Sequence, residues 1–329
     1  MAADVVDQPV NAGGALIWIG AASFAMFAYL LVAWVASGDA RPTTTGVDPV
    51  PGSVKVYVWI YQVAGVAILL GAIVVLGRRS IRARRLTLDA CIFIAWTVGV
   101  WTDPLTNNYL RTQMLYKLLR HQPGLLGWPH PRVAEPQSEN LLPEPLVAYG
   151  GQLLIAAVGT HFMRRARARW PQMGKVGLIL CGLATIAAID FVLEIVLIRT
   201  QLYAYPGSIR SLSLFAGTRY QFPVYETLVA GALFTSVAAL RFFVDDRGRS
   251  IAERGIDEQH LPAVRAGALR LLAVTGFVTL AMFGYSFFWY WASFYGGPYA
   301  KDFPSYMVND MCGPDTGYAC RHPEVPLRP

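Results

Sequence analysis

The chain is dominated by long apolar runs that contain almost no charged residues. A run of about 18 or more such residues is typical of a helix that crosses a membrane, because a helix satisfies its own backbone hydrogen bonds. Only 15% of the 329 residues are charged, against roughly 25% in soluble domains. The sequence therefore predicts an all-α, polytopic membrane helix bundle.

Seven segments are predicted to be membrane spans. They are residues Ala15–Ala36, Val56–Leu76, Leu88–Trp101, Leu146–Met163, Val176–Ile198, Val224–Phe243 and Leu269–Ala292. The third segment is short, so we expect its helix to extend into the flanking residues. This pattern predicts a short tail at residues 1–14, a single seven-helix membrane domain at 15–292, and a C-terminal tail at 293–329.

Basic residues cluster in three of the connections between these segments. They are Arg78, Arg79, Arg82, Arg84 and Arg85, then Arg164, Arg165, Arg167, Arg169 and Lys175, and finally Arg241, Arg247, Arg249, Arg254, Arg265 and Arg270. Basic connections stay in the cytoplasm, so this alternation predicts a cytoplasmic N-terminus and an extracytoplasmic C-terminus. The clusters also account for the net charge of +7. The sequence contains no stripe of basic residues interleaved with aromatic residues, so nucleic-acid binding is not expected. We expect the membrane to be a bacterial cytoplasmic membrane.

Aromatic residues concentrate near the ends of the spans. Five tryptophans lie there: Trp18, Trp59, Trp101, Trp289 and Trp291. We interpret most of them as an interfacial belt, in which indole rings lie at the level of the lipid headgroups.

Two cysteines lie close together in the predicted outer tail. Cys312 and Cys320 are eight residues apart, so an oxidising exterior favours a disulfide between them. The alternative is a pair of free thiols. No metal site is expected, because the chain has no CxxC motif and its histidines are scattered without ligand spacing.

The most informative residues are ionisable groups inside the predicted spans, where each costs about 2.5–3.5 kcal/mol on insertion scales. Asp190 and Glu194 lie four residues apart in the fifth span and therefore share one helix face. Arg199 follows near the outer end. The structural alternative is that Arg199 or another basic group simply neutralises Glu194.

Two further carboxylates are expected at a similar depth. Asp103 ends the third span and Glu226 opens the sixth; their polar neighbours are Asn107, Asn108, Arg111, Arg219 and Tyr225. By the predicted topology, Asp103, Glu194 and Glu226 fall toward the outer face, with Asp190 one turn deeper. Each residue also has a structural interpretation when taken singly. An aspartate before a proline, such as Asp103, is typical of a turn at a helix end, and a carboxylate at the start of a helix, such as Glu226, is favoured by the helix dipole. Together, the four carboxylates are predicted to line one cavity.

Acid–base chemistry is what such a set of groups provides. A carboxyl in an apolar pocket keeps its proton and can act as a general acid, and an ionised neighbour can act as a base or stabilise a cation. We assign Asp190 as proton donor and Glu194 as the cation-stabilising group. Asp103 and Glu226 would orient hydroxyls. Dehydration, ketal formation, cyclisation and proton-coupled transport can all use this arrangement.

At these same residues the chain resembles a known family. The segments WTDPLTNNY, DFVLEIVLIRTQLYAYPG and YQFPVYE look like those of the spirocyclases typified by the avermectin-pathway enzyme. The resemblance extends from about the second span into the seventh. It implies a cyclase that forms spiroketals from a lipophilic, polyketide-like or lipid substrate, in some members with dehydratase activity. We expect no cofactor. The alternative is a proton-coupled transporter or a lipid-binding protein, although no paired repeat is visible.

Overall fold

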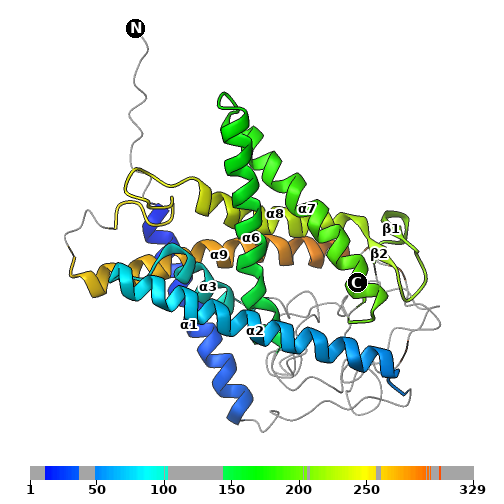
Figure 1. Ribbon diagram of the computed structural model, residues 1–329. Coiled ribbons are helices and arrows are strands. Elements are labelled where there is room, and N and C mark those ends of the chain that lie inside the picture. Colours follow the sequence, from blue (N-terminus) through cyan, green and yellow to red (C-terminus); the bar gives the residue numbers. More distant parts are fainter. Residues whose placement is uncertain are drawn as a thin grey trace.

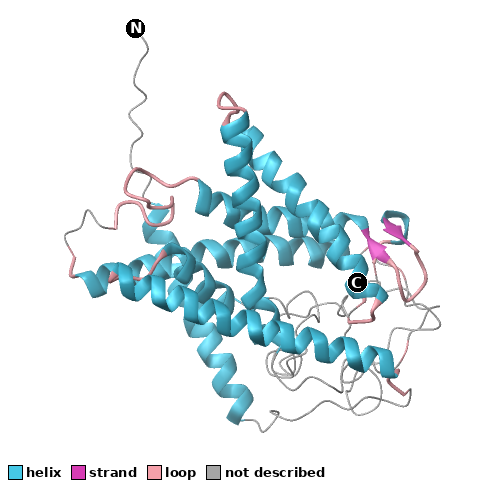
Figure 2. Ribbon diagram, in the orientation of Figure 1, coloured by secondary structure: helices cyan, strands magenta, loops and turns pink. Residues whose placement is uncertain are grey.

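The computed structural model describes residues 12–36, 49–99, 101–102, 144–202, 204–205, 208–256, 261–293, 295, 297 and 304. Helices account for most of these residues (Figures 1 and 2). They are α1 (Ala12–Ala36), α2 (Gly52–Ala83), α3 (Leu88–Gly99), α6 (Glu144–Arg169), α7 (Lys175–Arg199), α8 (Val224–Phe242) and α9 (Ala263–Ser293), with a short 3-10 turn η2 (Arg210–Leu212). Strands β1 (Ser213–Leu214) and β2 (Phe222–Pro223) pair antiparallel, with Ser213 opposite Pro223.

A helix lies at each of the seven predicted spans. Four of the described helices, α2, α7, α8 and the part of α9 from Ala263 to Trp289, are long and apolar enough to cross a membrane. Two shorter apolar helices run from Gly14 to Tyr29 and from Leu88 to Gly99. The predicted fold class, a helical membrane bundle, is confirmed. The number of crossings and their direction remain predictions.

Helix α2 shows most directly how the apolar runs are used. It exposes large apolar side chains along most of its length: Val56, Trp59, Ile60, Val63, Leu70, Ile73, Val74 and Val75. A water-soluble protein rarely exposes so large an apolar patch, whereas lipid tails are its natural neighbours. The helix ends at Arg84, whose φ of 50° is left-handed and turns the chain toward α3.

Helices α1 and α9 approach one another very closely at two glycines. A Cβ on Gly20 would lie 1.9 Å from the Leu272 carbonyl oxygen, and one on Gly276 would lie 2.0 Å from the Leu16 carbonyl oxygen. Small residues that allow backbones to touch are a common basis of helix association in membranes. Hydrogen bonds from the Thr279 hydroxyl and the Trp101 indole N–H to the Ser23 hydroxyl, 3.0 and 2.9 Å long, stabilise the same interface.

The main apolar core lies between α3, α6, α7, α8 and α9. Its largest fully buried side chains include Trp96, Met163, Leu178 and Ile186. The Trp96 ring packs against Phe234, with centroids 5.8 Å apart. Helices α7 and α8 pack against one another in this core and run in roughly opposite directions (Figure 1). Their packing matters for the site, because both helices carry buried carboxylates.

Ion pairs join the helix ends that carry the arginine clusters. Arg241 of α8 donates two hydrogen bonds to Asp89 of α3, 2.7 and 3.1 Å long, and a third to the Thr160 hydroxyl of α6. In the connection after α8, Arg249 pairs with Asp245 at 3.0 Å. The backbone N–H of Arg249 also donates to that carboxylate and is the main reason that the pKa of Asp245 is lowered.

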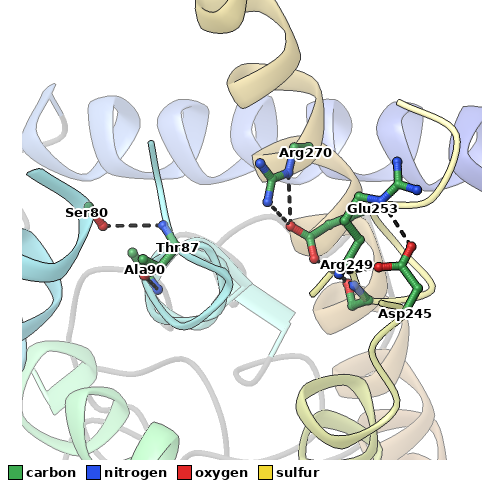
Figure 3. Close-up of polar contacts among 8 residues, drawn as sticks. Ser80, Thr87, Ala90, Asp245, Arg249, Glu253 and Arg270 are labelled. Atoms are coloured by element: carbon green, nitrogen blue, oxygen red, sulfur yellow. Dashed lines mark hydrogen bonds and ion pairs between the residues drawn. The ribbon is translucent and has the colours of Figure 1, made fainter. Parts of the chain in front are cut away.

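A fully buried ion pair anchors that connection to α9. Glu253 is buried; its Oε1 accepts hydrogen bonds from the Arg270 guanidinium, and its Oε2 accepts them from the backbone N–H and hydroxyl of Ser250. Figure 3 shows Arg270 pointing at Glu253 and Arg249 pointing at Asp245. Both Glu253 oxygens are therefore satisfied, one by a guanidinium.

The glycine crossing gives a direct test of the packing of α1 on α9. We expect Gly276→Ala to destabilise the protein by about 1–3 kcal/mol, because the new methyl group meets a backbone carbonyl that no side-chain movement can displace. Gly284→Ala on the same helix is the matched control, since nothing lies within 4 Å of its Cβ position. Thermal unfolding in detergent measures both variants. Equal unfolding temperatures would show that the helices do not cross in this way.

The buried pair gives a second test. Arg270→Met should cost about 3–5 kcal/mol, because it leaves the Glu253 charge buried without its cation. Adding Glu253→Gln should restore much of the loss by removing that charge. Arg265→Met, at an exposed position of the same helix, should be nearly neutral. Unfolding measured by denaturant titration in micelles compares the four proteins; no recovery in the double variant argues against a charge-based effect.

Candidate active site

One face of α7 is buried along its whole length. Residues four apart form this stripe: Leu178, Gly182, Ile186, Asp190, Glu194 and Ile198. Asp190 is 5% exposed and Glu194 is 9% exposed, while Val192 and Val196, each two residues beyond one of them, are exposed. The two carboxylates thus continue a stripe that begins with apolar residues, and the packing of α7 on α8 buries them.

A third carboxylate comes from the first turn of α8. Glu226 follows β2 directly, is 2% exposed, and lies close enough for its charge to act on Glu194. The charge of Asp190 also acts on Glu194. The structure therefore brings Asp190, Glu194 and Glu226 together between the C-terminal half of α7 and the start of α8.

Two tyrosines donate hydrogen bonds to these carboxylates. The Tyr205 hydroxyl donates to Glu194 Oε2, and the Tyr285 hydroxyl of α9 donates to Glu226 Oε1, each over 2.8 Å. Asp190 Oδ2 is buried and has no hydrogen-bond partner among the described residues. Within the same ranges, neither Asp190 nor Glu194 forms an ion pair with an arginine or lysine. Phenol hydroxyls thus donate to two members of this cluster, Glu194 and Glu226.

Tyr205 is held in place by the segment between α7 and α8. Its ring stacks on Trp289 of α9, with centroids 5.4 Å apart and planes 7° apart. The Gln221 side chain donates to the Tyr205 backbone carbonyl and accepts a hydrogen bond from the Gly217 N–H. Phe222 of β2 is fully buried against the same ring. The β1–β2 hairpin, at the end of α7 in Figure 1, thus fixes the phenol over Glu194.

Burial keeps the Tyr205 phenol protonated. It raises the pKa of Tyr205 well above its ordinary value, and the nearby charges of Glu194 and Glu226 act in the same direction. Near neutral pH this residue is therefore a hydrogen-bond donor and not a phenolate.

Two arginines at and beyond the C-terminal end of α7 lie close to aromatic rings. The Arg199 guanidinium lies 4.4 Å from the centroid of the Phe215 ring and 5.2 Å from that of Tyr220, and Arg219 lies 5.1 Å from that of Tyr220. Arg199 is exposed and forms no hydrogen bond or ion pair with Glu194. The carboxylate is hydrogen-bonded to Tyr205 instead.

The other predicted site residues divide into two groups. The Tyr225 hydroxyl accepts a hydrogen bond from the Ile209 N–H over 3.2 Å, and its ring packs against Trp289. The remaining residues lie outside the described ranges: Asp103, Asn107, Asn108, Arg111, Cys312 and Cys320. Their assignments therefore stay predictions. In the part of the chain that the structure describes, no group of His, Cys, Asp and Glu is arranged to hold a metal ion.

Several residues of the cluster have no role in the sequence-based assignment. They are Tyr205, Gln221, Tyr285 and Trp289. Trp289, interpreted from the sequence as an interfacial residue, is fully buried, whereas Trp18 is 78% exposed. The available signal was spacing: Tyr285 and Trp289 are four apart and share one face of α9. Nothing in the sequence shows that this face meets α7 and α8.

Comparison with known proteins identifies the family. Residues 83–307, more than half of the chain, match the model of the family described as "Spirocyclase AveC-like". The match begins at the end of α2 and includes all three carboxylates. The chain therefore belongs to this family, as its resemblance had indicated, and membership implies a spirocyclase-type role in polyketide biosynthesis. No curated protein and no solved structure matches the chain.

The hydrogen bond between Tyr205 and Glu194 can be tested by stability. Tyr205→Phe should cost about 1–3 kcal/mol, because a buried carboxylate loses its donor. The pKa of tyrosine in the unfolded chain is near 10. Because the pKa of Tyr205 is higher in the folded protein, its contribution to stability is complete below pH 10 and declines as the pH rises further. The difference from wild type should therefore be constant between pH 7 and about pH 10, and smaller above it.

Unfolding of the detergent-solubilised protein as a function of pH measures this difference. Tyr29→Phe, at an exposed position of α1, is the control and should match wild type. A Tyr205→Phe variant as stable as wild type at pH 7 would show that the hydrogen bond contributes nothing.

Proposed function

We propose that the protein is a membrane-embedded cyclase that forms spiroketals, with Asp190, Glu194 and Glu226 as its acid–base groups. The observation that carries this proposal is the gathering of three buried carboxylates, two of them hydrogen-bonded to phenol hydroxyls, at the α7–α8–α9 junction. Family membership supports the reaction class.

Two other carboxylates among the described residues provide the contrast. Asp89, which is half-buried, and Glu253, which is buried, each accept hydrogen bonds from a guanidinium and so join neighbouring elements of the fold. Asp190 and Glu194 have no such partner among the described residues, although Arg199 lies only five residues beyond Glu194. A carboxyl group buried without a cation is costly as an anion. Such a group is suited to holding and releasing a proton during a reaction.

Spiroketal closure needs only proton transfers and the loss of one water. A substrate hydroxyl adds to a ketone carbon, its proton passes to a carboxylate, and the ketone oxygen receives a proton, which gives a hemiketal. A carboxylic acid then protonates the hemiketal hydroxyl. The C–O bond breaks, water departs, and an oxocarbenium ion is formed. A second hydroxyl attacks that carbon and returns its proton to the carboxylate. No electrons are exchanged with an oxidant or reductant.

Each carboxylate takes one role in this sequence. Asp190, the deepest of the three, donates the proton that releases water, since it has no hydrogen-bond donor or cation among the described residues to stabilise its anion. Glu194, which the Tyr205 hydroxyl stabilises as an anion, faces the oxocarbenium ion. Glu226, hydrogen-bonded to Tyr285, orients the attacking hydroxyl. We assign Asp103, with Asn107, Asn108 and Arg111, to the same orienting task.

The surroundings indicate the kind of substrate. The carboxylates are enclosed by Phe191, Phe222, Tyr225 and Trp289 within a bundle whose outer surface is apolar. Such walls fit a lipophilic polyketide-like or lipid chain that enters from the bilayer, here a bacterial cytoplasmic membrane. With the N-terminus in the cytoplasm, the carboxylates lie toward the outer face. Water loss without ring closure, a dehydratase reaction, would use the same proton donor.

Substitution of the carboxylates tests the proposal. Purified protein in nanodiscs would be incubated with a synthetic dihydroxyketone, and the spiroketal enantiomers separated by chiral chromatography with mass detection. Wild type should form one enantiomer in excess. Asp190→Asn and Glu194→Gln should each lower the rate about 100- to 10,000-fold, the usual contribution of general acid–base catalysis.

Matched controls separate catalysis from folding. Asp246→Asn changes an exposed carboxylate near the arginine-rich end and should leave the rate unchanged. All variants should elute as wild type does in size-exclusion chromatography. Full activity in both site variants would exclude carboxylate catalysis. Carboxylate-dependent uptake of the dihydroxyketone into proteoliposomes without cyclisation would indicate a proton-coupled transporter instead.

A further inference from the structure

Trp289 has a buried polar group without a partner. Its side chain is 0% exposed, and its indole N–H has no hydrogen-bond acceptor among the described residues. Leaving a buried donor unpaired is unfavourable, because the group has lost its hydrogen bonds to water and gained none in the protein. Trp101 shows the usual arrangement, because its indole N–H donates to the Ser23 hydroxyl over 2.9 Å.

The indole ring that carries this N–H packs against the tyrosines of the carboxylate cluster. The Trp289 ring stacks on Tyr205, the residue that donates to Glu194. It also packs at 6.5 Å against Tyr285, the residue that donates to Glu226, and at 5.6 Å against Tyr225. One tryptophan therefore contacts both phenols that hold the site carboxylates. Packing alone does not require a hydrogen-bond donor here, since a phenylalanine ring would also fill apolar space and has no N–H group.

We propose that Trp289 is a substrate-binding residue whose indole N–H donates a hydrogen bond to an oxygen of the ketone or ketal. This assignment rests on the proposed cyclase function. An indole N–H can only donate, so its ligand is an acceptor such as a carbonyl, hydroxyl or ether oxygen. The aromatic faces around it favour a ligand that is otherwise hydrocarbon. A cyclic ketal within a carbon skeleton has both properties.

The indole N–H itself can report on binding. In protein labelled with ¹⁵N-tryptophan, the Trp289 resonance is identified by its loss in Trp289→Phe. The probe is the parent spiroketal of two six-membered rings, compared with the all-carbon spirocycle of the same ring sizes. The spiroketal should shift the Trp289 N–H resonance, and the hydrocarbon should shift it far less. The Trp101 resonance, whose donor is already paired, should stay in place.

Kinetics of the same variant give an independent measurement. Trp289→Phe keeps an aromatic ring against Tyr205 but removes the donor. We expect KM for the dihydroxyketone to rise about 3- to 10-fold with kcat nearly unchanged, which is the effect of losing one hydrogen bond formed equally in ground and transition states. Trp291→Phe, at an exposed position of α9, should leave both constants unchanged.

The outcomes distinguish this inference from the proposed function. If wild type cyclises the dihydroxyketone, but the Trp289 resonance does not respond to the spiroketal and Trp289→Phe keeps its KM, the inference is wrong and the cyclase function stands. If wild type neither cyclises the precursor nor binds the spiroketal, both are wrong. A lower unfolding temperature without any change in KM or resonance would mark Trp289 as purely structural.

Discussion

Burial of carboxylates inside a helix bundle is the constraint on which this structure depends. Each one must find its partners within the protein, because lipid provides none. The chain solves this problem in two ways. At the arginine-rich helix ends, guanidinium groups hold Asp89 and Glu253 in charge-assisted hydrogen bonds, which are about twice as strong as neutral ones. At the α7–α8–α9 junction, Glu194 and Glu226 accept hydrogen bonds from phenols. The first arrangement joins helices to one another, and the second is the arrangement on which the proposed acid–base chemistry rests.

The phenol over Glu194 depends on a segment that is not a helix. Tyr205 follows α7, and the hairpin β1–β2 keeps it in position through the Gln221 amide and the buried Phe222 ring. Gly297, beyond α9, donates its N–H to the Ser208 carbonyl and so joins the end of the last helix to the same segment. The site is thus built where loops cover the helix ends, as is common when a rigid scaffold positions binding groups.

The sequence predicted the helices far better than the site, for a physical reason. Apolar length and charge placement act locally, so each predicted span coincides with a helix, and α2 differs mainly by extending to Gly52 and Ala83. The four-residue spacing of Asp190 and Glu194 likewise follows from helix geometry. Which side of α9 faces them is a question of tertiary packing, set by contacts such as Gly20 against Leu272. Trp289 therefore resembled an interfacial residue, and Tyr205, in an irregular loop, had no periodic pattern to identify it. The assignments of Asp103, Arg111 and the Cys312–Cys320 bridge stay predictions.

The cost of burying these carboxylates is also what the proposed chemistry requires. An oxocarbenium ion in water is captured by water and returns to the hemiketal, so the second hydroxyl succeeds only where water is scarce. Phe191, Phe222 and Trp289 belong to one apolar cluster, whose side chains offer water no hydrogen bonds except the Trp289 N–H and whose ring faces attract a cation. In that environment an ionised Glu194 stabilises the cation more strongly than it would in a solvated cleft. A wetter site would make the carboxylates less costly for the fold and less effective for ring closure. The apolar burial that first marks Asp190 and Glu194 in the sequence is thus the physical condition under which they can act as catalysts.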